Sequence, residues 1–293
     1  MELLKTNQFN VVGTLKSVDL QERTSSKTGN QFVLGSILVE SVIKGETNEF
    51  VIDLFANKLT ADKKPSKLYE NYLDLNNLIG KKIDVSGNLS ENRYFSEKSN
   101  QMASRQTLSG RFIKGVVPNT ADSATFSVGG FVVSNLVEKK RKDNSIYAYE
   151  LTLAQANYRE DNLTMFRLQV KPEDTDIVRG IEKTYKVGDT VLISGELNFL
   201  VETTTQTIEN AFGAPTVKTY QNRYNSFYVT GGSNPEQGES AYSTELIQSL
   251  IAAYKAKDVE IKAAADERNA SNGSIAEQTP AQPSISARQV SLI

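Results

Sequence analysis

The chain has 293 residues, and its 33 basic and 35 acidic side chains give a net charge of −2 at pH 7. It contains no cysteine and no histidine, which excludes disulfides, thiolate zinc centres and catalytic sites of the Ser-His-Asp or Cys-His kind. The acidic residues are spread along the sequence without a tight cluster for magnesium. We therefore expect a non-enzymatic protein without a cofactor. Any attraction for a polyanion must come from a local face.

The sequence also predicts where the protein works. No run of apolar residues is long enough to span a membrane, and the N-terminal segment is too short and too polar for a secretory signal. We expect a cytoplasmic protein without membrane contact, or one in the host cytoplasm if a phage encodes it.

The second half of the chain repeats landmarks of the first half. The matching pairs are Phe9 and Phe126, Gly80 and Gly188, Gly87 and Gly195, and Phe112 and Phe227. A near-constant offset through all four pairs predicts two copies of one domain. We place the first domain at residues 1–117, the second at 124–232, and a linker, an amphipathic helix and a flexible tail at 233–293.

Five strands and one helix are predicted in the first copy. Alternating, β-branched stretches predict the strands, and a stripe of apolar residues spaced for one helical face predicts the helix. The expected elements are strands at 11–20, 31–42 and 49–56, a helix within 59–78, and strands at 81–89 and 107–117. Polar loops are expected at 21–30 and 90–106.

The second copy is predicted to follow the same order and to continue into a helical extension. The expected elements are strands at 126–138, 146–157 and 163–171, a short helix at 174–183, and strands at 189–201 and 222–231. Polar loops are expected at 138–145 and 202–221. Ser243 can cap a helix that runs to about Arg268, and its apolar stripe from Leu246 to Tyr254 is expected to dock on a barrel. Residues 270–293 are expected to be disordered.

This strand order predicts a mainly β protein with two tandem OB-folds. The OB-fold is a small five-stranded Greek-key barrel that binds oligonucleotides on the face of strands two and three and with the loops joining strands 1–2 and 4–5. Gly13 and Gly130 lie inside the predicted first strands. A small barrel needs glycine where a strand bends, so these two residues are expected to support the fold and to bear no ligand.

The predicted 1–2 loops are basic. Cations at such positions can contact phosphates and release counterions, although a solubilising hairpin tip is the alternative interpretation. The candidates are Arg23 and Lys27 in the first copy and Lys139, Lys140, Arg141 and Lys142 in the second.

The predicted 4–5 loops mix aromatic rings with cations. Stacking a base on an exposed ring is worth about 1–3 kcal/mol and tolerates any sequence. The alternative for each ring is that it packs back onto a barrel. The candidates are Arg93, Tyr94, Phe95, Lys98 and Arg105 in the first copy and Phe212, Lys218, Tyr220, Arg223 and Tyr224 in the second.

The strands supply a further set of candidates for a stacking platform and its flanking cations. Alternate strand residues face inward, so about half of the rings belong to the core, and the period alone does not say which half. The candidates are Phe32, Phe55 and Lys58 in the first copy and Tyr147, Tyr158, Arg159, Phe166 and Arg167 in the second.

The segment Val11-Val12-Gly13-Thr14-Leu15, followed by Thr28-Gly29-Asn30 and an alternating strand, resembles the opening of single-stranded DNA-binding proteins of the bacterial and phage replication type. The resemblance to a tandem OB-fold architecture covers about residues 9–232. It implies sequence-tolerant binding of single-stranded DNA, or also RNA, in phage DNA replication, recombination or repair. Bases would stack on aromatic rings, and lysine and arginine would hold phosphates.

The chain departs from that family in two respects. It has no tryptophan, the strongest stacking residue. The family recruits replication or recombination proteins through an acidic C-terminal tip, whereas this chain ends in Ser291-Leu292-Ile293 with Arg288 nearby. Recruitment would therefore involve the C-terminal region without an acidic tip.

Two other functions are compatible with the sequence. The first is a structural or assembly protein, such as a virion component, that uses OB-folds as protein-binding modules, since a fold does not fix a function. The near-zero net charge favours it. The second is an enzyme fragment whose barrels present substrate to a missing catalytic domain, although no phosphate-cradling motif occurs in the sequence.

Overall fold

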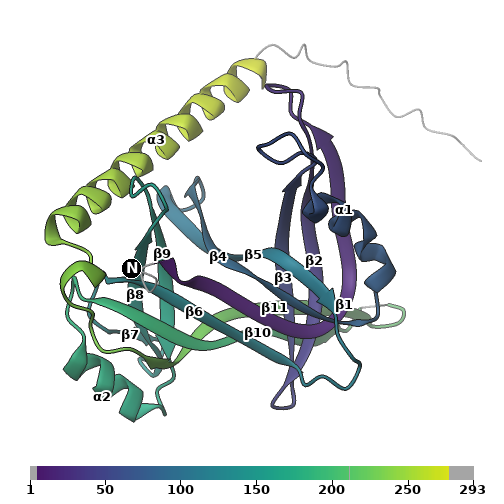
Figure 1. Cartoon of the computed structure of the whole chain (residues 1–293). Coiled ribbons are helices and arrows are strands. Elements are labelled where there is room, and N and C mark those ends of the chain that lie inside the picture. The colour runs from purple at the N-terminus through teal and green to yellow at the C-terminus, as the bar shows by residue number, and fades with distance from the viewer. Residues whose placement is uncertain (1–4, 211, 277–293) are drawn as a thin grey trace, which may run out of the picture.

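The structure, a computed structural model, describes residues 5–210 and 212–276, without the side chains of Tyr220 and 269–276. In these residues, eleven strands form one continuous sheet in the order β2-β3-β5-β4-β1-β6-β10-β11-β9-β8-β7. Figure 1 shows the two groups of strands side by side, with the long helix α3 reaching across one end of both. The predicted fold class is confirmed: the chain is mainly β, with two OB-like units and a C-terminal helix.

The first copy contains five strands and a short helical segment. The strands are β1 (Asn7–Thr24), β2 (Gln31–Ile43), β3 (Glu46–Asn57), β4 (Lys82–Ser96) and β5 (Gln101–Gly115). The helical segment consists of α1 (Lys67–Leu73) and the 3₁₀ helix η2 (Asp74–Leu78). It is shorter than predicted because Pro65 disfavours helical backbone before it and Ser66 caps the helix, its Oγ accepting from the Tyr69 N–H at 3.4 Å.

The second copy repeats this order with one extra break. Its elements are β6 (Ser123–Val132), β7 (Val137–Lys140), β8 (Ile146–Ala156), β9 (Leu163–Val170), α2 (Thr175–Thr184), β10 (Thr190–Ile208) and β11 (Thr216–Gly232). The predicted strand at 126–138 is divided, because the chain leaves the sheet between Val132 and Val137. The 3₁₀ helix η3 (Gly238–Ser240) and α3 (Thr244–Ala276) follow. Residues 277–293 of the predicted flexible tail lie outside the described residues.

The two copies meet through their first strands. β1 and β6 pair antiparallel, and Phe9 lies directly opposite Phe126. These two residues are equivalent in the sequence repeat, so the copies are related by an approximate two-fold axis through this pair. Antiparallel pairing lets the sheet run from one copy into the other without an edge.

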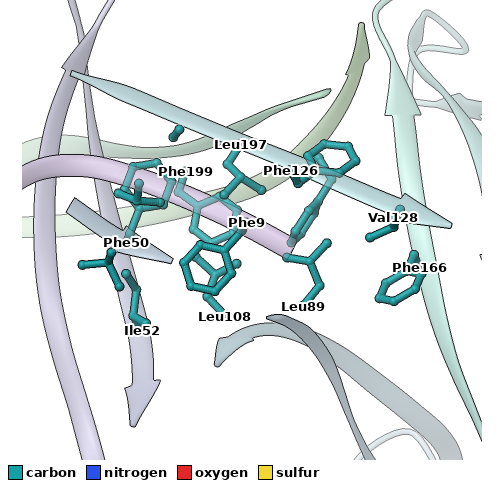
Figure 2. Close-up of a cluster of buried hydrophobic side chains, with 14 of the residues drawn as sticks. Phe9, Phe50, Ile52, Leu89, Leu108, Phe126, Val128, Phe166, Leu197 and Phe199 are labelled. Atoms are coloured by element: carbon teal, nitrogen blue, oxygen red, sulfur yellow. The ribbon is translucent and has the colours of Figure 1, made fainter. Parts of the chain in front are cut away.

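The hydrophobic core is continuous across the junction. Ring centroids of Phe50 and Phe199 are 5.1 Å apart, and those of Phe199 and Phe227 are 5.4 Å apart. Figure 2 shows Phe50 and Phe199 among buried side chains from strands of both copies. Burying such rings supplies the main stabilising free energy of small barrels, and here it couples the two copies.

The largest departure from prediction concerns the segments expected to be the 4–5 loops, which are strands. β4 and β5 stay paired as far as Ser96 and Gln101, and β10 and β11 as far as Ile208 and Thr216. We call these two ribbons hairpin A (residues 82–115) and hairpin B (residues 190–232). Their outer parts carry polar residues on both sides, so they lack the apolar alternation that predicts a strand.

The register of the hairpins also corrects one sequence match. Gly87 lies opposite Gly110, and Gly195 lies opposite Val229, each one step beyond a β-bulge. Counting outward from these pairs, the equivalent of Phe227 is the buried Leu108, so the match of Phe112 to Phe227 is wrong.

The glycines in the first strands, Gly13 and Gly130, are required by close packing against a neighbouring strand. A Cβ atom on Gly13 would lie 2.4 Å from the Glu40 carbonyl oxygen, and one on Gly130 would lie 2.3 Å from the Ala154 carbonyl oxygen. Strand two of each copy therefore approaches strand one too closely for any side chain at these positions. This agrees with the predicted structural role.

Helix α3 begins on the second copy. Its apolar side chains pack against Phe131, Leu163 and Tyr242, and Leu250 is 1 % exposed, as expected for docking on a barrel. The helix then extends beyond the predicted end at about residue 268. None of the helices in the described part of the chain is both long and apolar enough to cross a membrane.

Candidate nucleic-acid interface

The outer face of β2 and β3 in the first copy presents two phenylalanines. Phe55 is 55 % exposed, and its ring centroid lies 5.6 Å from that of the half-buried Phe32 at a tilt of 39°. The pairing of β1 with β2 sets Arg23 directly opposite Phe32, and directly opposed residues share a face of the sheet. The register therefore brings a cation and two predicted platform rings together.

Two lysines flank these rings. Lys58 follows β3, and its Nζ donates to Gln31 Oε1 at 2.7 Å, which holds it at the start of β2. Lys27 is exposed in the turn between β1 and β2. We define the strand face as Arg23, Phe32, Phe55 and Lys58, an arrangement in which cations border an accessible aromatic surface.

The strand face continues along β3 into a groove between the two copies. The groove has a volume of about 280 Å³ and is lined by Glu49, Val51, Asp53, Arg105 and Gln106 of the first copy and by Phe199, Arg223 and Asn225 of the second, among others. The predicted cations Arg105 and Arg223 thus meet from hairpins A and B.

The charges in this groove are partly paired. Arg223 Nη2 lies 2.8 Å from Glu49 Oε2. Burial raises the pKa of Asp53, and the nearby Arg105 guanidinium lowers it in part. Across the described ranges, no three acidic side chains come together where they could hold a metal ion. The two arginines of the groove can therefore bind a phosphate chain if the phosphates replace Glu49 and Asp53 as their acidic neighbours.

The basic run of the second copy is largely neutralised within the protein. Lys139 Nζ lies 2.9 Å from Glu150 Oε1, and Lys140 Nζ lies 2.8 Å from Glu138 Oε2. The Arg141 guanidinium lies 6.0 Å from the ring centroid of the exposed Tyr147. Lys142 is exposed in the turn before β8. These residues lie at the β7 end of the sheet order, whereas the strand face lies at the β2 end.

The remaining strand candidates of the second copy are divided between surface and core. Tyr158 is exposed, with Lys5 Nζ 5.2 Å from its ring centroid, and Arg159 is exposed beside it. Arg167 is exposed, and its backbone N–H donates to Gln106 Oε1 at 3.2 Å, which places it next to the groove. Phe166 was expected on the surface, but it is fully buried because the even positions of β9 face the core, so its ring is inaccessible to a base.

Hairpin A is covered on one side by helix α3. The Arg93 side chain is 9 % exposed and pairs with Asp258, and its guanidinium carbon lies 3.4 Å from the Tyr254 ring centroid. Lys262 Nζ lies 5.6 Å from the ring centroid of Phe95. Tyr94 is exposed, as is Lys98 in the turn. Two of the predicted contacts of this hairpin, Arg93 and Phe95, are therefore engaged within the protein.

Hairpin B is uncovered in its outer part. Lys218 and Tyr224 are exposed along β11, and Phe212 is exposed in the turn. The side chain of Tyr220 lies outside the described residues. The two hairpins thus differ in how much of their surface a ligand can reach.

Sequence reasoning missed one exposed ring and both contacts from α3. Phe112 is 70 % exposed on β5, between two hollows of about 440 and 400 Å³, whereas its match to Phe227 had assigned it a repeat position that is buried. The sequence did not indicate that Tyr254 and Asp258 contact hairpin A, because nothing in the helical pattern shows which strand the helix will meet.

A family model named YorF matches residues 5–267, and the chain therefore belongs to the YorF family. A search of curated proteins finds no match. Among solved structures, the chain is similar to the wild-type single-stranded DNA binding protein from Thermus aquaticus, with a TM-score of 0.50, 15% sequence identity, and coverage of 82% of this chain and 97% of that chain. At this identity the likeness shows a shared fold.

Two weaker similarities carry no argument. A deletion mutant of the Thermus aquaticus protein has a TM-score of 0.47 at 14% identity, with coverage of 82% of this chain and 97% of that chain. The small single-stranded DNA-binding protein from Streptomyces coelicolor has a TM-score of 0.27 at 15% identity, with coverage of 39% of this chain and 96% of that chain.

Proposed function

We propose that this protein binds single-stranded DNA without regard to base sequence, on the strand face and in the adjoining groove. The observation that carries the proposal is the exposed Phe55 ring beside Phe32, with Arg23 opposite Phe32 and Lys58 at the end of β3, on the face of strands two and three that OB-folds use for oligonucleotides. The fold shared with a single-stranded DNA binding protein supports it.

The geometry assigns different tasks to the residues of this surface. A base can stack on Phe55, since every base has a flat apolar surface and stacking needs no specific hydrogen bonds. Arg23 and Lys58 are placed to contact the flanking phosphates. The strand then follows β3 into the groove, where Arg105 and Arg223 provide cations from both copies. Because Arg223 is paired with Glu49 and Arg105 lies near Asp53, binding depends on rings as much as on charge.

We further propose that the bound strand is protected without chemical change, in phage DNA replication, recombination or repair. The resemblance of residues 11–15 and 28–30 to the bacterial and phage replication type supports this role. The proposal excludes catalysis, includes RNA as a competing ligand, and gives the C-terminal region the contacts to replication or recombination proteins.

The pairing of Lys139 with Glu150 and of Lys140 with Glu138 favours a second candidate, a protein-binding assembly module. Such a module has no need of free cations. It would show stable higher-order association in solution and no retention of single-stranded DNA.

The test is fluorescence anisotropy of labelled oligo-dT, with duplex DNA for comparison, at two salt concentrations. Phe55→Ala should weaken binding by about tenfold, the lower part of the range for loss of one stacked base. Phe112→Ala is the matched control, because it removes an even more exposed phenylalanine from another surface, and it should leave affinity unchanged. Lack of salt-sensitive binding by the unmodified protein would refute the proposed function.

A further inference from the structure

The part of α3 from Tyr254 onward, which we call its second half, covers one side of hairpin A through polar contacts. Arg93 Nη2 donates to the Tyr254 carbonyl oxygen at 2.9 Å and also to Asp258 Oδ1. The guanidinium carbon of Arg93 lies over the Tyr254 ring, 3.4 Å from the ring centroid. Helix α3 therefore contacts the arginine through the Nη2 nitrogen and through its planar face.

Glu91 fixes the same junction from the hairpin side. Its Oε1 accepts from the Tyr254 hydroxyl at 2.8 Å, and its Oε2 accepts from the Met165 backbone N–H at 3.0 Å. Burial and the hydrogen bond to Glu91 raise the pKa of Tyr254, so the tyrosine remains a neutral donor. Helix α3, hairpin A and β9 thus meet at one carboxylate.

The two halves of α3 are attached by different forces. The first half is anchored by apolar packing, with Leu250 buried against the second copy. The second half begins with Tyr254, whose ring still packs against that apolar cluster, and beyond it is held by an ion pair, hydrogen bonds and the cation Lys262 over Phe95. Ionic contacts weaken with salt and can be exchanged for other charged partners, whereas apolar packing cannot. The second half can therefore detach while the first half stays in place.

The groups under this half of the helix are those that a nucleic-acid strand would contact. The Arg93 guanidinium donates to a carboxylate oxygen of Asp258, and a phosphate oxygen can accept from an arginine as well as a carboxylate oxygen does. Phe95 presents a ring on which a base can stack in place of a lysine.

We propose that the second half of α3 is a clasp that covers a second strand-binding surface, Arg93 and Phe95, and that single-stranded DNA displaces it. This rests on the proposed function. A phosphate replaces Asp258 at Arg93, and a base replaces Lys262 over Phe95. Because the clasp must open first, it lowers the affinity of the closed protein, and weakening the clasp raises the affinity.

The first experiment compares Asp258→Asn with Glu260→Gln in the full chain, using labelled oligo-dT at low salt. Both variants remove one negative charge from α3, but Glu260 is exposed and makes none of the contacts described above between the clasp and hairpin A. Asp258→Asn should bind oligo-dT about fivefold more tightly, which corresponds to the largest contributions measured for exposed ion pairs. Glu260→Gln should bind with the affinity of the unmodified protein. If the two variants bind oligo-dT with equal affinity, the clasp proposal is wrong but the proposed function is unaffected. Absence of binding by all three proteins would overturn the proposed function as well.

The second experiment measures the opening itself. The sequence has no cysteine, so spin labels can be placed at chosen pairs of sites without background. A pair at Glu97 and Val259 reports on the hairpin turn and the second half of α3, and a pair at Arg159 and Gln248 reports on the anchored half. Saturating oligo-dT should lengthen the first distance and leave the second unchanged. An unchanged first distance in a protein shown to bind DNA would overturn the proposal.

Discussion

Hairpins A and B occupy the same place in the repeated unit but meet different neighbours. Each leaves its barrel at an equivalent glycine, Gly87 or Gly195, one step beyond a bulge. Hairpin A is then covered by α3, which leaves the Arg93 side chain 9 % exposed. On hairpin B, Arg223 pairs with Glu49 of β3, and its side chain is 45 % exposed. The repeat determines where the hairpins begin, and a segment outside the repeat determines which of them is accessible.

The approximate two-fold axis explains how the hairpins cross between copies. Hairpin A contacts β9 of the second copy through Glu91 and Met165. Hairpin B contacts β3 of the first copy, where the Phe199 N–H donates to Asn48 Oδ1 at 2.7 Å. Each hairpin therefore contacts the other copy, and helix α3 breaks the symmetry between the two hairpins.

The largest expected effect comes from removing the anchor that places α3 over hairpin A. Leu250→Ala should lower the free energy of unfolding by about 3 kcal/mol, since truncating a buried leucine costs both transfer free energy and a cavity. Val259→Ala, at an exposed position of the same helix, should change stability by less than about 0.5 kcal/mol. Urea denaturation measures both. Similar small losses would show that α3 is not anchored at Leu250.

The second prediction tests the equivalence of the hairpin bases. A Cβ atom on Gly87 would lie 2.0 Å from the Ser109 carbonyl oxygen, and one on Gly195 would lie 2.0 Å from the Tyr228 carbonyl oxygen. Gly87→Ala and Gly195→Ala should each cost about 2–3 kcal/mol, because backbone atoms must move. Gly115→Ala, where the Cβ meets nothing within 4 Å, is the control. Thermal unfolding should rank the first two alike, and a large difference between them would contradict the repeat.

The third prediction separates the two hairpin arginines. Arg93→Ala should lower the free energy of unfolding by about 2 kcal/mol, because it leaves a carboxylate without its hydrogen-bonded partner in a site that is mostly buried. Arg223→Ala should cost less than about 1 kcal/mol, as expected for an exposed pair. Chemical denaturation of both variants gives the comparison. Equal costs would mean that α3 does not distinguish the hairpins.

The smallest effect concerns Asp53 in the groove beside hairpin B. Burial raises the pKa of this carboxyl above its usual value. The folded protein is therefore more stable at acid pH, where Asp53 is protonated, and loses this stability as the pH rises through the raised pKa. Asp53→Asn mimics the protonated form. It should raise the free energy of unfolding by a few tenths of a kcal/mol at neutral pH, after allowance for solvent screening, and have no effect at acid pH. Denaturation at the two pH values checks this, and a loss of stability at neutral pH would be contrary to it.

Much of the fold could be predicted because the barrels carry strong local signals. β2, β3, β8 and β9 fall within a few residues of their predicted bounds, since one side of each strand is buried and alternation follows. The outer parts of hairpins A and B could not be predicted, because strands exposed on both sides have no such pattern. The match of Phe112 to Phe227 failed for a related reason: a single residue type was aligned, whereas the pairing register decides equivalence.

The candidate site was only partly predictable. Arg23, Phe32 and Phe55 come together because the hydrogen-bond register of β1, β2 and β3 aligns them. The run from Lys139 to Lys142 is the most basic stretch of the sequence, yet Glu138 and Glu150 neutralise two of its lysines through a pairing that only the fold reveals. Arg93 and Phe95 were engaged by α3 across a long stretch of chain. Local charge and aromatic content therefore indicate candidates, and tertiary contacts decide which are available.

The most direct test of the strand face is photo-cross-linking with an oligo-dT that carries 5-iodouracil, followed by mass-spectrometric mapping of the attached residue. We expect attachment at Phe55 on β3, with no attachment at the even more exposed Phe112 on β5. Attachment at Phe112, or a bound complex without cross-links to the strand face, would contradict the account.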